Sequence, residues 1–397
     1  MGKTKKNKWV KKRHRCVFAF LRFAMRGMMK ARYHYTAQPA DLPAGPYLIL
    51  CNHQTTMDPF FLSLSFRFQI YFFASDDIFN LKVSPLIKYL VAPIPKSKSL
   101  TDLAAIKDVF RVLREKGAVG IFPEGNRTVS GGQWEMTEAI AKLAKAAKVP
   151  LVLYNLCGGY GTDPRWGHNI RKGRFHGYVR RILSPEEVKA MPLEELFAAI
   201  CDGLKVDDTV SGVHFKSRKK AEYIERALYL CPQCGAVSSF RSEKNGFACG
   251  NCGLKAEYTE DLRISPAVGP QKFGRIFEWY EYERKEIVKR VLNGEKVGDA
   301  GVLFRESIKF KRKKKLAGDR VSIDKNALTV SDGKSVAVYP LGEIEALTMV
   351  GKKKFNFYHG GKILQIKGGK RFCAVKYVHI FDGLRSEAAA RGEIDQH

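Results

Sequence analysis

The sequence predicts three folded parts in succession: an α/β domain with a largely parallel sheet, a small segment organised by cysteines, and a C-terminal, β-barrel-like α+β domain. Three observations carry this prediction. Between residues 46 and 225, short apolar runs alternate with helical patterns, which is typical of α/β sheets. Two Cys-x2-Cys pairs follow within residues 231–252. From residue 301, short strands with turn signals recur at regular spacing and end in a helix.

The α/β domain is predicted at residues 36–228. Four apolar runs have the length and composition of buried strands: PYLILC, IYFFAS, AVGIFP and VPLVLYNL. Residues 103–116 and 135–148 carry apolar side chains at helical spacing. Active sites of such sheets tend to lie where the parallel strands end, so the residues that follow each run are the first candidates for a site.

The chain of 397 residues carries a formal net charge of +29, which predicts a polyanionic partner, either nucleic acid or an anionic membrane. Residues 1–35 hold much of this charge and are expected to form a basic arm that becomes an amphipathic helix. Such a helix can lie in the headgroup layer of a membrane surface. The other interpretation is a helix that packs on the domain and leaves its basic face in water.

The expected location follows from two further features. No apolar run reaches the length of about 20 residues that crosses a bilayer. Several of the nine cysteines are scattered along the chain without a pattern, which suits a reducing compartment. We therefore expect a cytoplasmic protein that binds peripherally to the cytoplasmic face of the membrane.

The first strand, PYLILC, ends in Asn52 and His53, and Asp58 follows shortly afterwards. Five steps along a helix turn about 500°, so His53 and Asp58 need a turn between them to meet. An aspartate before Pro59 suits a helix start, which predicts Asp58 as the N-cap. An imidazole oriented by a carboxylate is a general base. By itself, however, a His–Asp pair at this spacing is more often a capping arrangement.

A second polar loop, FPEGNRT, follows the strand AVGIFP. It offers Glu124, a flexible Gly125 and Arg127, and an arginine beside backbone N–H groups suits a phosphate. The alternative is a surface ion pair between Arg127 and Glu124. Between the two loops, Lys96 and Lys98 supply further positive charge.

Together these segments resemble the lysophospholipid and glycerol-phosphate acyltransferase family. NHQTTMD resembles its histidine–x4–aspartate motif and FPEGNRT its phenylalanine-proline-glutamate-glycine-x-arginine motif, while APIPKSKS and VPLVLYNL occupy the places of its two other motifs. The order and separation agree over roughly residues 30–225. In two places the chain departs from the family pattern: Lys98 replaces an arginine and Leu153 replaces a proline. A lysine cannot form the bidentate fork of an arginine, which leaves the acceptor headgroup open.

The resemblance implies direct acyl transfer, without a covalent acyl-enzyme, from acyl-CoA or acyl-carrier protein to the hydroxyl of a lysophospholipid. The expected reaction is 1-acylglycerol-3-phosphate giving phosphatidate in phospholipid biosynthesis. His53 would take the proton of the hydroxyl, Asp58 would orient His53, and the acceptor would be held by Glu124, Gly125, Arg127, Lys98 and Lys96. The competing hypothesis is a non-catalytic lipid- or nucleic-acid-binding adaptor, which uses the charge but leaves both motifs unexplained.

The cysteine segment, residues 229–256, contains Cys231 and Cys234, then fourteen residues, then Cys249 and Cys252. Two Cys-x2-Cys pairs, each followed by a glycine, are typical of knuckles that together hold one structural Zn²⁺. Disulfides are the alternative, and the scattered cysteines elsewhere argue against them. The segment resembles a zinc ribbon. Its linking stretch lacks the interleaved aromatic and basic residues that stack bases, so no nucleic acid is expected as a partner.

A charged amphipathic helix within 257–300 is predicted to link this segment to residues 301–397. The element order of that last part, seven short strands and a terminal helix, resembles the pleckstrin-homology type of barrel. Its basic loops, at 309–315 and 351–354, suit anionic lipid headgroups. A solvated charged surface is the alternative interpretation.

Overall fold

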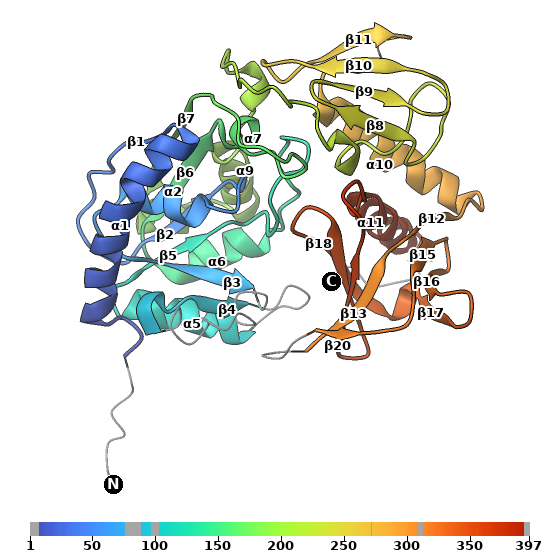
Figure 1. Ribbon diagram of the computed structural model, residues 1–397. Coiled ribbons are helices and arrows are strands. Elements are labelled where there is room, and N and C mark those ends of the chain that lie inside the picture. Colours follow the sequence, from blue (N-terminus) through green and yellow to red (C-terminus); the bar gives the residue numbers. More distant parts are fainter. Residues whose placement is uncertain (1–7, 76–88, 97–102, 271, 309–312, 393–397) are drawn as a thin grey trace. The chain divides into compact units, whose positions relative to one another are not determined.

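The computed structural model describes residues 8–75, 89–96, 103–270, 272–308 and 313–392. These residues form two compact units: the chain up to Pro164 together with Ile170–Phe215, and Arg165–Asn169 together with the chain from Lys216 (Figure 1). Lys98 and most of the basic run at 309–315 lie outside the described residues.

The first unit is built on a seven-stranded sheet in the order β1-β7-β6-β2-β5-β3-β4 (Figure 1). The neighbours β6, β2, β5, β3 and β4 run parallel, and only β7 runs antiparallel to its neighbour β6. The predicted α/β domain with a largely parallel sheet is thus present. The strands are β1 (Tyr35–Ala37), β2 (Leu48–Cys51), β3 (Ile70–Ser75), β4 (Ile94–Lys96), β5 (Ala118–Ile121), β6 (Leu151–Cys157) and β7 (Phe175–Leu183).

Helices cover both faces of this sheet because successive strand residues point to opposite faces. Ile49 packs into a core with α1 and α2, whereas its neighbours Leu48 and Leu50 pack into a second core with α5, α6 and α9 (Figure 1). In the described ranges, no helix has the length and apolarity needed to cross a bilayer. The helices are α1 (Lys12–Tyr33), α2 (Asp58–Ser65), α5 (Leu103–Arg114), α6 (Ala139–Ala147), α7 (Gly159–Thr162), α8 (Pro185–Ala190) and α9 (Leu193–Gly203).

One local prediction was wrong by a residue. Helix α2 begins at Asp58 itself, and its N-cap is Met57, whose side chain makes no cap hydrogen bond. The Asp58 carboxylate turns back into the preceding turn, where it accepts the N–H groups of Gln54 and Thr55. Because the carboxylate accepts these N–H groups, it does not accept the N–H groups of the first turn of the helix, as a capping aspartate would.

The second unit begins with a four-stranded sheet in the order β11-β10-β9-β8, which is followed by α10. The sequence predicted no strands in the cysteine segment. The helix predicted within 257–300 is present as α10, which begins at Ile276. The bounds are β8 (Phe240–Glu243), β9 (Gly246–Cys249), β10 (Lys255–Tyr258), β11 (Ile264–Val268) and α10 (Ile276–Leu292).

Two more sheets, β12-β15-β16-β17 and β14-β13-β20-β19-β18, complete this unit together with a terminal helix, as the β-rich prediction required. The sequence missed β12, β14 and β15, which are short and lie in no clear apolar run. The bounds are β12 (Val297–Ala300), β13 (Leu303–Ser307), β14 (Lys314–Lys315), β15 (Arg320–Ile323), β16 (Ala327–Ser331), β17 (Val336–Pro340), β18 (Ile344–Val350), β19 (Lys354–His359), β20 (Lys362–Lys367) and α11 (Val375–Ala390).

Candidate active site

The two polar loops predicted from the sequence lie side by side at the carboxyl edge of the sheet. They follow β2 and β5, which are parallel neighbours in the sheet. Two hydrogen bonds join them: the N–H of His53 donates to Oε1 of Glu124 over 2.9 Å, and the N–H of Thr128 donates to the carbonyl of His53 over 2.9 Å. The strand order therefore brings the HX4D turn and the FPEGNRT loop into one site.

His53 and Asp58 form a hydrogen-bonded pair, with 2.8 Å between Nδ1 and Oδ2. The Asp58 side chain is fully buried and also accepts the N–H groups of Gln54 and Thr55 and the hydroxyl of Thr55. These donors stabilise the carboxylate as an anion. An anionic carboxylate at Nδ1 favours the tautomer that carries its proton on Nδ1 and its lone pair on Nε2.

The His53 ring remains accessible while its orientation is fixed. Its side chain is 19% exposed, and its ring stacks on Phe122 with 4.4 Å between the centroids. Phe122 stacks in turn on Phe72, at 6.0 Å. The imidazole is thus held by the Asp58 carboxylate at Nδ1 and by the Phe122 ring on its face. An imidazole that is fixed in orientation and still accessible can act as a general base.

Glu124 has a buried carboxylate that organises the loop. One oxygen accepts the N–H of His53, and the other accepts the N–H of Trp134 over 2.9 Å. Burial and, to a smaller extent, the negative charge of Asp58 raise the pKa of Glu124 to about 7, against the effect of these two hydrogen bonds. Glu124 thus joins the backbone of His53 to that of Trp134, which follows the FPEGNRT loop.

In the rest of the FPEGNRT loop, Gly125 forms a turn and the indole of Trp134 binds the backbone of Arg127. Gly125 adopts φ +65°, a left-handed conformation that favours glycine, and its N–H donates to the carbonyl of Phe122. Nε1 of Trp134 donates to the carbonyl of Arg127 over 2.9 Å. Burial lowers the pKa of Arg127, while Asp163 and Asp58 act in the opposite direction. Trp134 carried no signal in the sequence.

Polar residues around His53, which the sequence analysis did not single out, join the site to β6 and α7. The Asn52 side chain accepts the N–H and donates to the carbonyl of Leu156. Oε1 of Gln54 accepts the N–H of Gly159 over 2.8 Å. Buried Asp208 accepts the N–H of Gly158 over 2.6 Å. The signal that could have found Asn52 and Gln54 is their position directly after a buried strand.

The predicted lysines are placed only in part. Lys96 ends β4, which runs parallel to β3, so its backbone lies at the same edge of the sheet as His53 and Glu124. Lys98, which stands in the place of an arginine of the family, lies outside the described residues.

The variant Glu124→Gln tests whether the carboxylate of Glu124 is buried in the folded protein. The folded-state pKa of about 7 lies above the ordinary value of 4.5, so the stabilising contribution of Glu124 is present below the ordinary value and lost as pH rises through about 7. Glutamine has no charge to bury. We therefore expect the stability of the variant relative to wild type to rise by roughly 2 kcal/mol from pH ~4.5 to pH ~8, measured by urea unfolding. A difference that does not change with pH would contradict this assignment.

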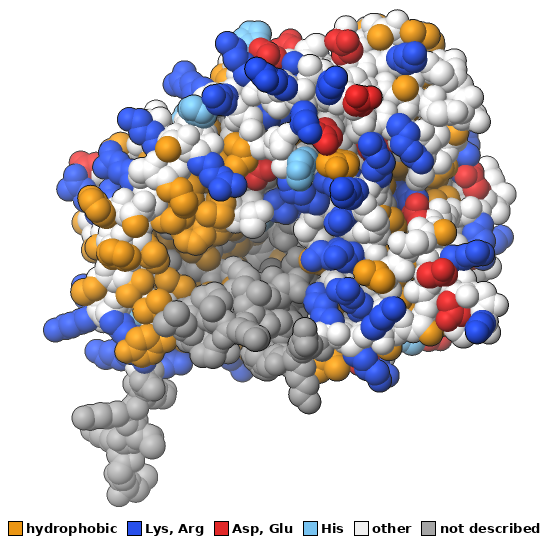
Figure 2. Space-filling model, in the orientation of Figure 1, with side chains coloured by type: hydrophobic (Ala, Val, Ile, Leu, Met, Phe, Trp, Pro, Cys, Tyr) orange, Lys and Arg blue, Asp and Glu red, His pale blue; other side chains and the backbone are white. Residues whose placement is uncertain are grey.

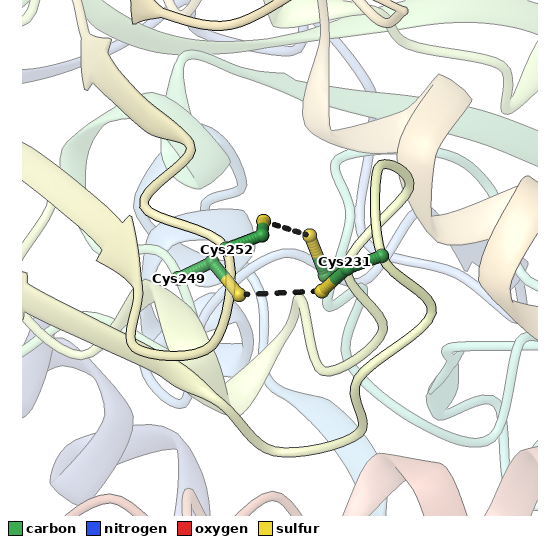
Figure 3. A group of neighbouring side chains, drawn as sticks. Cys231, Cys249 and Cys252 are labelled. Carbon is green, nitrogen blue, oxygen red and sulfur yellow. Dashed lines mark hydrogen bonds between the residues drawn. The ribbon is translucent and has the colours of Figure 1, made fainter.

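In the second unit, the four cysteines of the two Cys-x2-Cys pairs converge (Figure 3). Their sulfurs all lie within 4.8 Å of one another, with 3.7 Å from Cys231 to Cys252 and from Cys234 to Cys249. Zn–S bonds of about 2.3 Å at the tetrahedral angle place sulfurs about 3.8 Å apart. The spacing fits one tetrahedral ion and is too long for disulfide bonds, which measure about 2.05 Å.

Comparison with known proteins agrees with the geometry around His53 and Asp58. Residues 34–153 match the model of the acyltransferase family. The 1-acyl-sn-glycerol-3-phosphate acyltransferase of Bacillus subtilis (strain 168) is 26% identical over 184 residues, which are 46% of this chain and 86% of that protein. A probable 1-acyl-sn-glycerol-3-phosphate acyltransferase of Mycoplasma pneumoniae is 26% identical over 129 residues, 31% of this chain and 48% of that protein.

Two solved structures share weaker likenesses. The 1-acyl-sn-glycerophosphate acyltransferase PlsC of Thermotoga maritima covers 48% of this chain and 93% of its own, with 16% identity and a TM-score of 0.36. The N-terminal PH domain of human ARAP2 covers 26% of this chain and 90% of its own, with 14% identity and a TM-score of 0.20. TM-scores this low do not establish a shared fold. The family model and the curated relatives match the segment that holds both loops, so this segment is an acyltransferase domain and the protein is an O-acyltransferase.

Proposed function

We propose that the protein moves a fatty acyl group from acyl-CoA or acyl-carrier protein to the free hydroxyl of 1-acylglycerol-3-phosphate, giving phosphatidate in phospholipid biosynthesis. The observation that carries the proposal is the His53–Asp58 pair, 2.8 Å apart, hydrogen-bonded through the backbone to the FPEGNRT loop. The names of the curated relatives support this choice of acceptor. A non-catalytic adaptor would have no use for an accessible histidine aligned by a buried aspartate.

In the proposed mechanism, Nε2 of His53 takes the proton of the acceptor hydroxyl while the oxygen attacks the carbonyl carbon of the acyl thioester. Asp58 stabilises the imidazolium that forms. The tetrahedral intermediate then collapses, the C–S bond breaks, and the imidazolium returns the proton to the leaving thiolate. An ester bond has replaced a thioester bond, and no group on the enzyme has been acylated.

The acceptor phosphate is proposed to bind at the FPEGNRT loop. Arg127 supplies a guanidinium, and its partial burial strengthens its interaction with an anion. Gly125, which is exposed and has open space where a Cβ would stand, lets the acceptor approach the backbone. Lys96 and Lys98 are proposed to supply further positive charge to the acceptor phosphate. Glu124 acts by holding the loop in place.

A substrate screen tests the function. The purified full-length chain is incubated with labelled acyl-CoA or acyl-carrier protein and a series of lysophospholipids in detergent micelles. Transfer to 1-acylglycerol-3-phosphate is expected to exceed transfer to lysophosphatidylcholine by about tenfold or more, because the choline group masks the phosphate charge. Absence of transfer to every acceptor would contradict the proposal, and equal transfer to both would contradict the assigned acceptor.

We propose that the four cysteines hold one structural Zn²⁺. Gly235 and Gly253, which follow the two pairs, adopt left-handed conformations and donate their N–H groups to the carbonyls of Cys231 and Cys249. These turns point the sulfurs of each pair at a common centre. Four thiolates leave no open coordination position, so the ion would stabilise the fold and take no part in acyl transfer.

We also propose that the protein works at an anionic membrane surface, on its cytoplasmic face. Figure 2 shows hydrophobic side chains gathered over the part of the surface that α1 forms. On α1, Phe20 is 69% exposed and Phe23 is 83% exposed, and basic residues flank both on the same helix. Exposed aromatic side chains within a basic amphipathic helix suit insertion into the headgroup layer.

The double variant Phe20→Ser with Phe23→Ser is expected to lower partitioning onto anionic vesicles by roughly 100-fold, because each phenylalanine loses at least about 1.5 kcal/mol of apolar burial. Vesicle sedimentation measures the effect. Val210→Ser, which changes an equally exposed apolar residue outside α1, serves as the control and should bind like wild type. Wild-type binding by the double variant would remove α1 from the membrane contact.

A further inference from the structure

A cavity of about 250 Å³ lies beside α1 in the first unit. One wall is a stripe of α1 with the helical spacing i, i+3, i+4, i+7: Arg15, Phe18, Ala19 and Arg22. The opposite wall comes from residues 67–71 and 116–118, which lead into β3 and β5. These are the amino ends of β3 and β5. His53 follows the carboxyl end of β2, which runs parallel to its neighbour β5, so the cavity and the catalytic pair lie at opposite edges of the sheet.

The cavity is strongly cationic. Its lining includes four basic side chains and, among the described residues, no carboxylate: Arg15, Arg22, Arg67 and Lys116. The pKa of Arg22 is lowered, first by burial and then by the charges of Arg26 and Arg67. The carboxylate of Glu115 accepts the N–H of Val10 in the lining, so the unbalanced positive charge lies mainly around Arg22 and Arg67. An anion that entered the cavity would relieve the repulsion.

The remaining lining indicates what kind of anion fits. Phe18, Phe68 and Tyr71 provide apolar surface, so the ligand should carry an uncharged part beside its charge. The Gln69 side chain is 9% exposed, its Nε2 donates to the carbonyl of Ile70, and its Oε1 is buried with no hydrogen-bond partner. Because this oxygen is buried, a ligand hydroxyl could donate to it only after the Gln69 side chain turns toward the cavity. Phosphate, hydroxyl and apolar surface together describe the headgroup region of a glycerophospholipid.

We propose that this cavity binds the phosphate-bearing headgroup of an anionic phospholipid that stays in the bilayer, at a site separate from the acyl acceptor. The inference rests on the proposed membrane-surface function, because the same helix presents Phe20 and Phe23 to the surroundings. Arg15 and Arg22 would hold the phosphate. The bound lipid fixes the position of the enzyme on the membrane and is not consumed by the reaction.

A pair of variants at one exposed position tests the charge of the cavity. Ala44 lines it, and Ala44→Glu places a carboxylate there, whereas Ala44→Gln adds the same bulk without charge. Partitioning onto phosphatidylcholine vesicles that contain phosphatidylglycerol is expected to fall about tenfold in Ala44→Glu and to stay within about twofold of wild type in Ala44→Gln. Equal losses in the two variants would mean a steric effect and would overturn the proposal.

A second pair separates the cavity from general attraction to a charged membrane. Arg22→Gln with Arg67→Gln and the control Arg180→Gln with Arg181→Gln remove the same charge, and Arg180 and Arg181 are exposed on β7. The cavity pair is expected to lower partitioning at least about tenfold more than the control pair. Equal losses would overturn the proposal. Thermal melting of each variant confirms that it is folded.

Two further measurements separate the alternatives. Glycerol 3-phosphate, added without vesicles, should not raise the melting temperature of the wild type. A clear increase that Ala44→Glu abolishes would assign the cavity to a soluble phosphate and overturn the lipid assignment. Acyl transfer in detergent micelles tests the proposed function alone, because it needs no vesicle. Its failure would leave the vesicle result for the Ala44 pair intact, so the two failures are distinguishable.

Discussion

The variant His53→Ala is expected to transfer acyl groups about 10³-fold more slowly than wild type, because general base catalysis contributes about 10²–10⁴ to such reactions. The loss should appear in kcat, with little change in KM for the acceptor, since Arg127 and the FPEGNRT loop remain. Steady-state kinetics with the best acceptor of the substrate screen measures both constants. Activity within about tenfold of wild type would remove His53 from the chemical step.

The partner variant Asp58→Asn examines how His53 is oriented. An amide at this position can donate to Nδ1 of His53, which favours the tautomer with its proton on Nε2 and no lone pair facing the acceptor. A loss of about 10²–10⁴ in kcat is expected. Because Asp58 also accepts hydrogen bonds from Gln54 and Thr55, the variant should melt at a lower temperature.

Controls for both variants are available in the chain. His214 is exposed and lies in the same unit, so His214→Ala should keep wild-type kinetics and stability. His53→Ala should keep the wild-type melting temperature within a few degrees, because its side chain is partly exposed. An inactive His53→Ala protein that has also unfolded would carry no weight, and the kinetics of Asp58→Asn would then decide the role of the pair.

Loss of zinc is expected to have the largest effect on stability. The purified chain should contain about one zinc per molecule, and the double variant Cys234→Ser with Cys249→Ser should contain none, because two of four ligands are gone. Structural zinc contributes about 10–16 kcal/mol in small zinc-binding peptides. In this larger unit we expect the melting temperature to fall by roughly 10 °C or more. Metal analysis and calorimetry measure the two quantities.

The control for the zinc prediction is Cys16→Ser, which changes an exposed cysteine outside the cluster and should keep both the zinc and the melting temperature. Wild-type protein that is purified without chelators and contains no zinc would contradict the proposed ion. Zinc retained by the double variant would show that the metal binds at other residues.

The local features of the site followed from the sequence. The turn after β2 could be predicted because an apolar run ends at Cys51 and the spacing of His53 and Asp58 excludes a helix between them. The cluster of four cysteines could be predicted because each knuckle is a local turn that needs only its own cysteines and glycine. Even here the start of α2 was misplaced by one residue, since the Asp58 carboxylate bonds backward to Thr55.

Long-range contacts could not be predicted in the same way. Glu124 accepts the N–H of His53 across 71 residues of chain, and Asn52 bonds to Leu156 across 104. Such contacts depend on the order β6-β2-β5 in the sheet, which the local pattern of apolar residues does not encode. Trp134 lies in a polar stretch with no secondary structure of its own, so nothing in its surroundings marked it as a partner of Glu124.

By itself, the sequence determined the class of reaction. The motifs that indicate it are short continuous segments, so they can be recognised without knowing the fold. The sequence also determined the ligands of the proposed zinc ion, since their spacing is local. Only the tertiary structure decided that Glu124 is buried with a raised pKa, that His53 is held from both loops, and that cations gather at the opposite edge of the sheet. Burial and convergence arise from strand order and layer packing, which bring together residues that are far apart in the sequence.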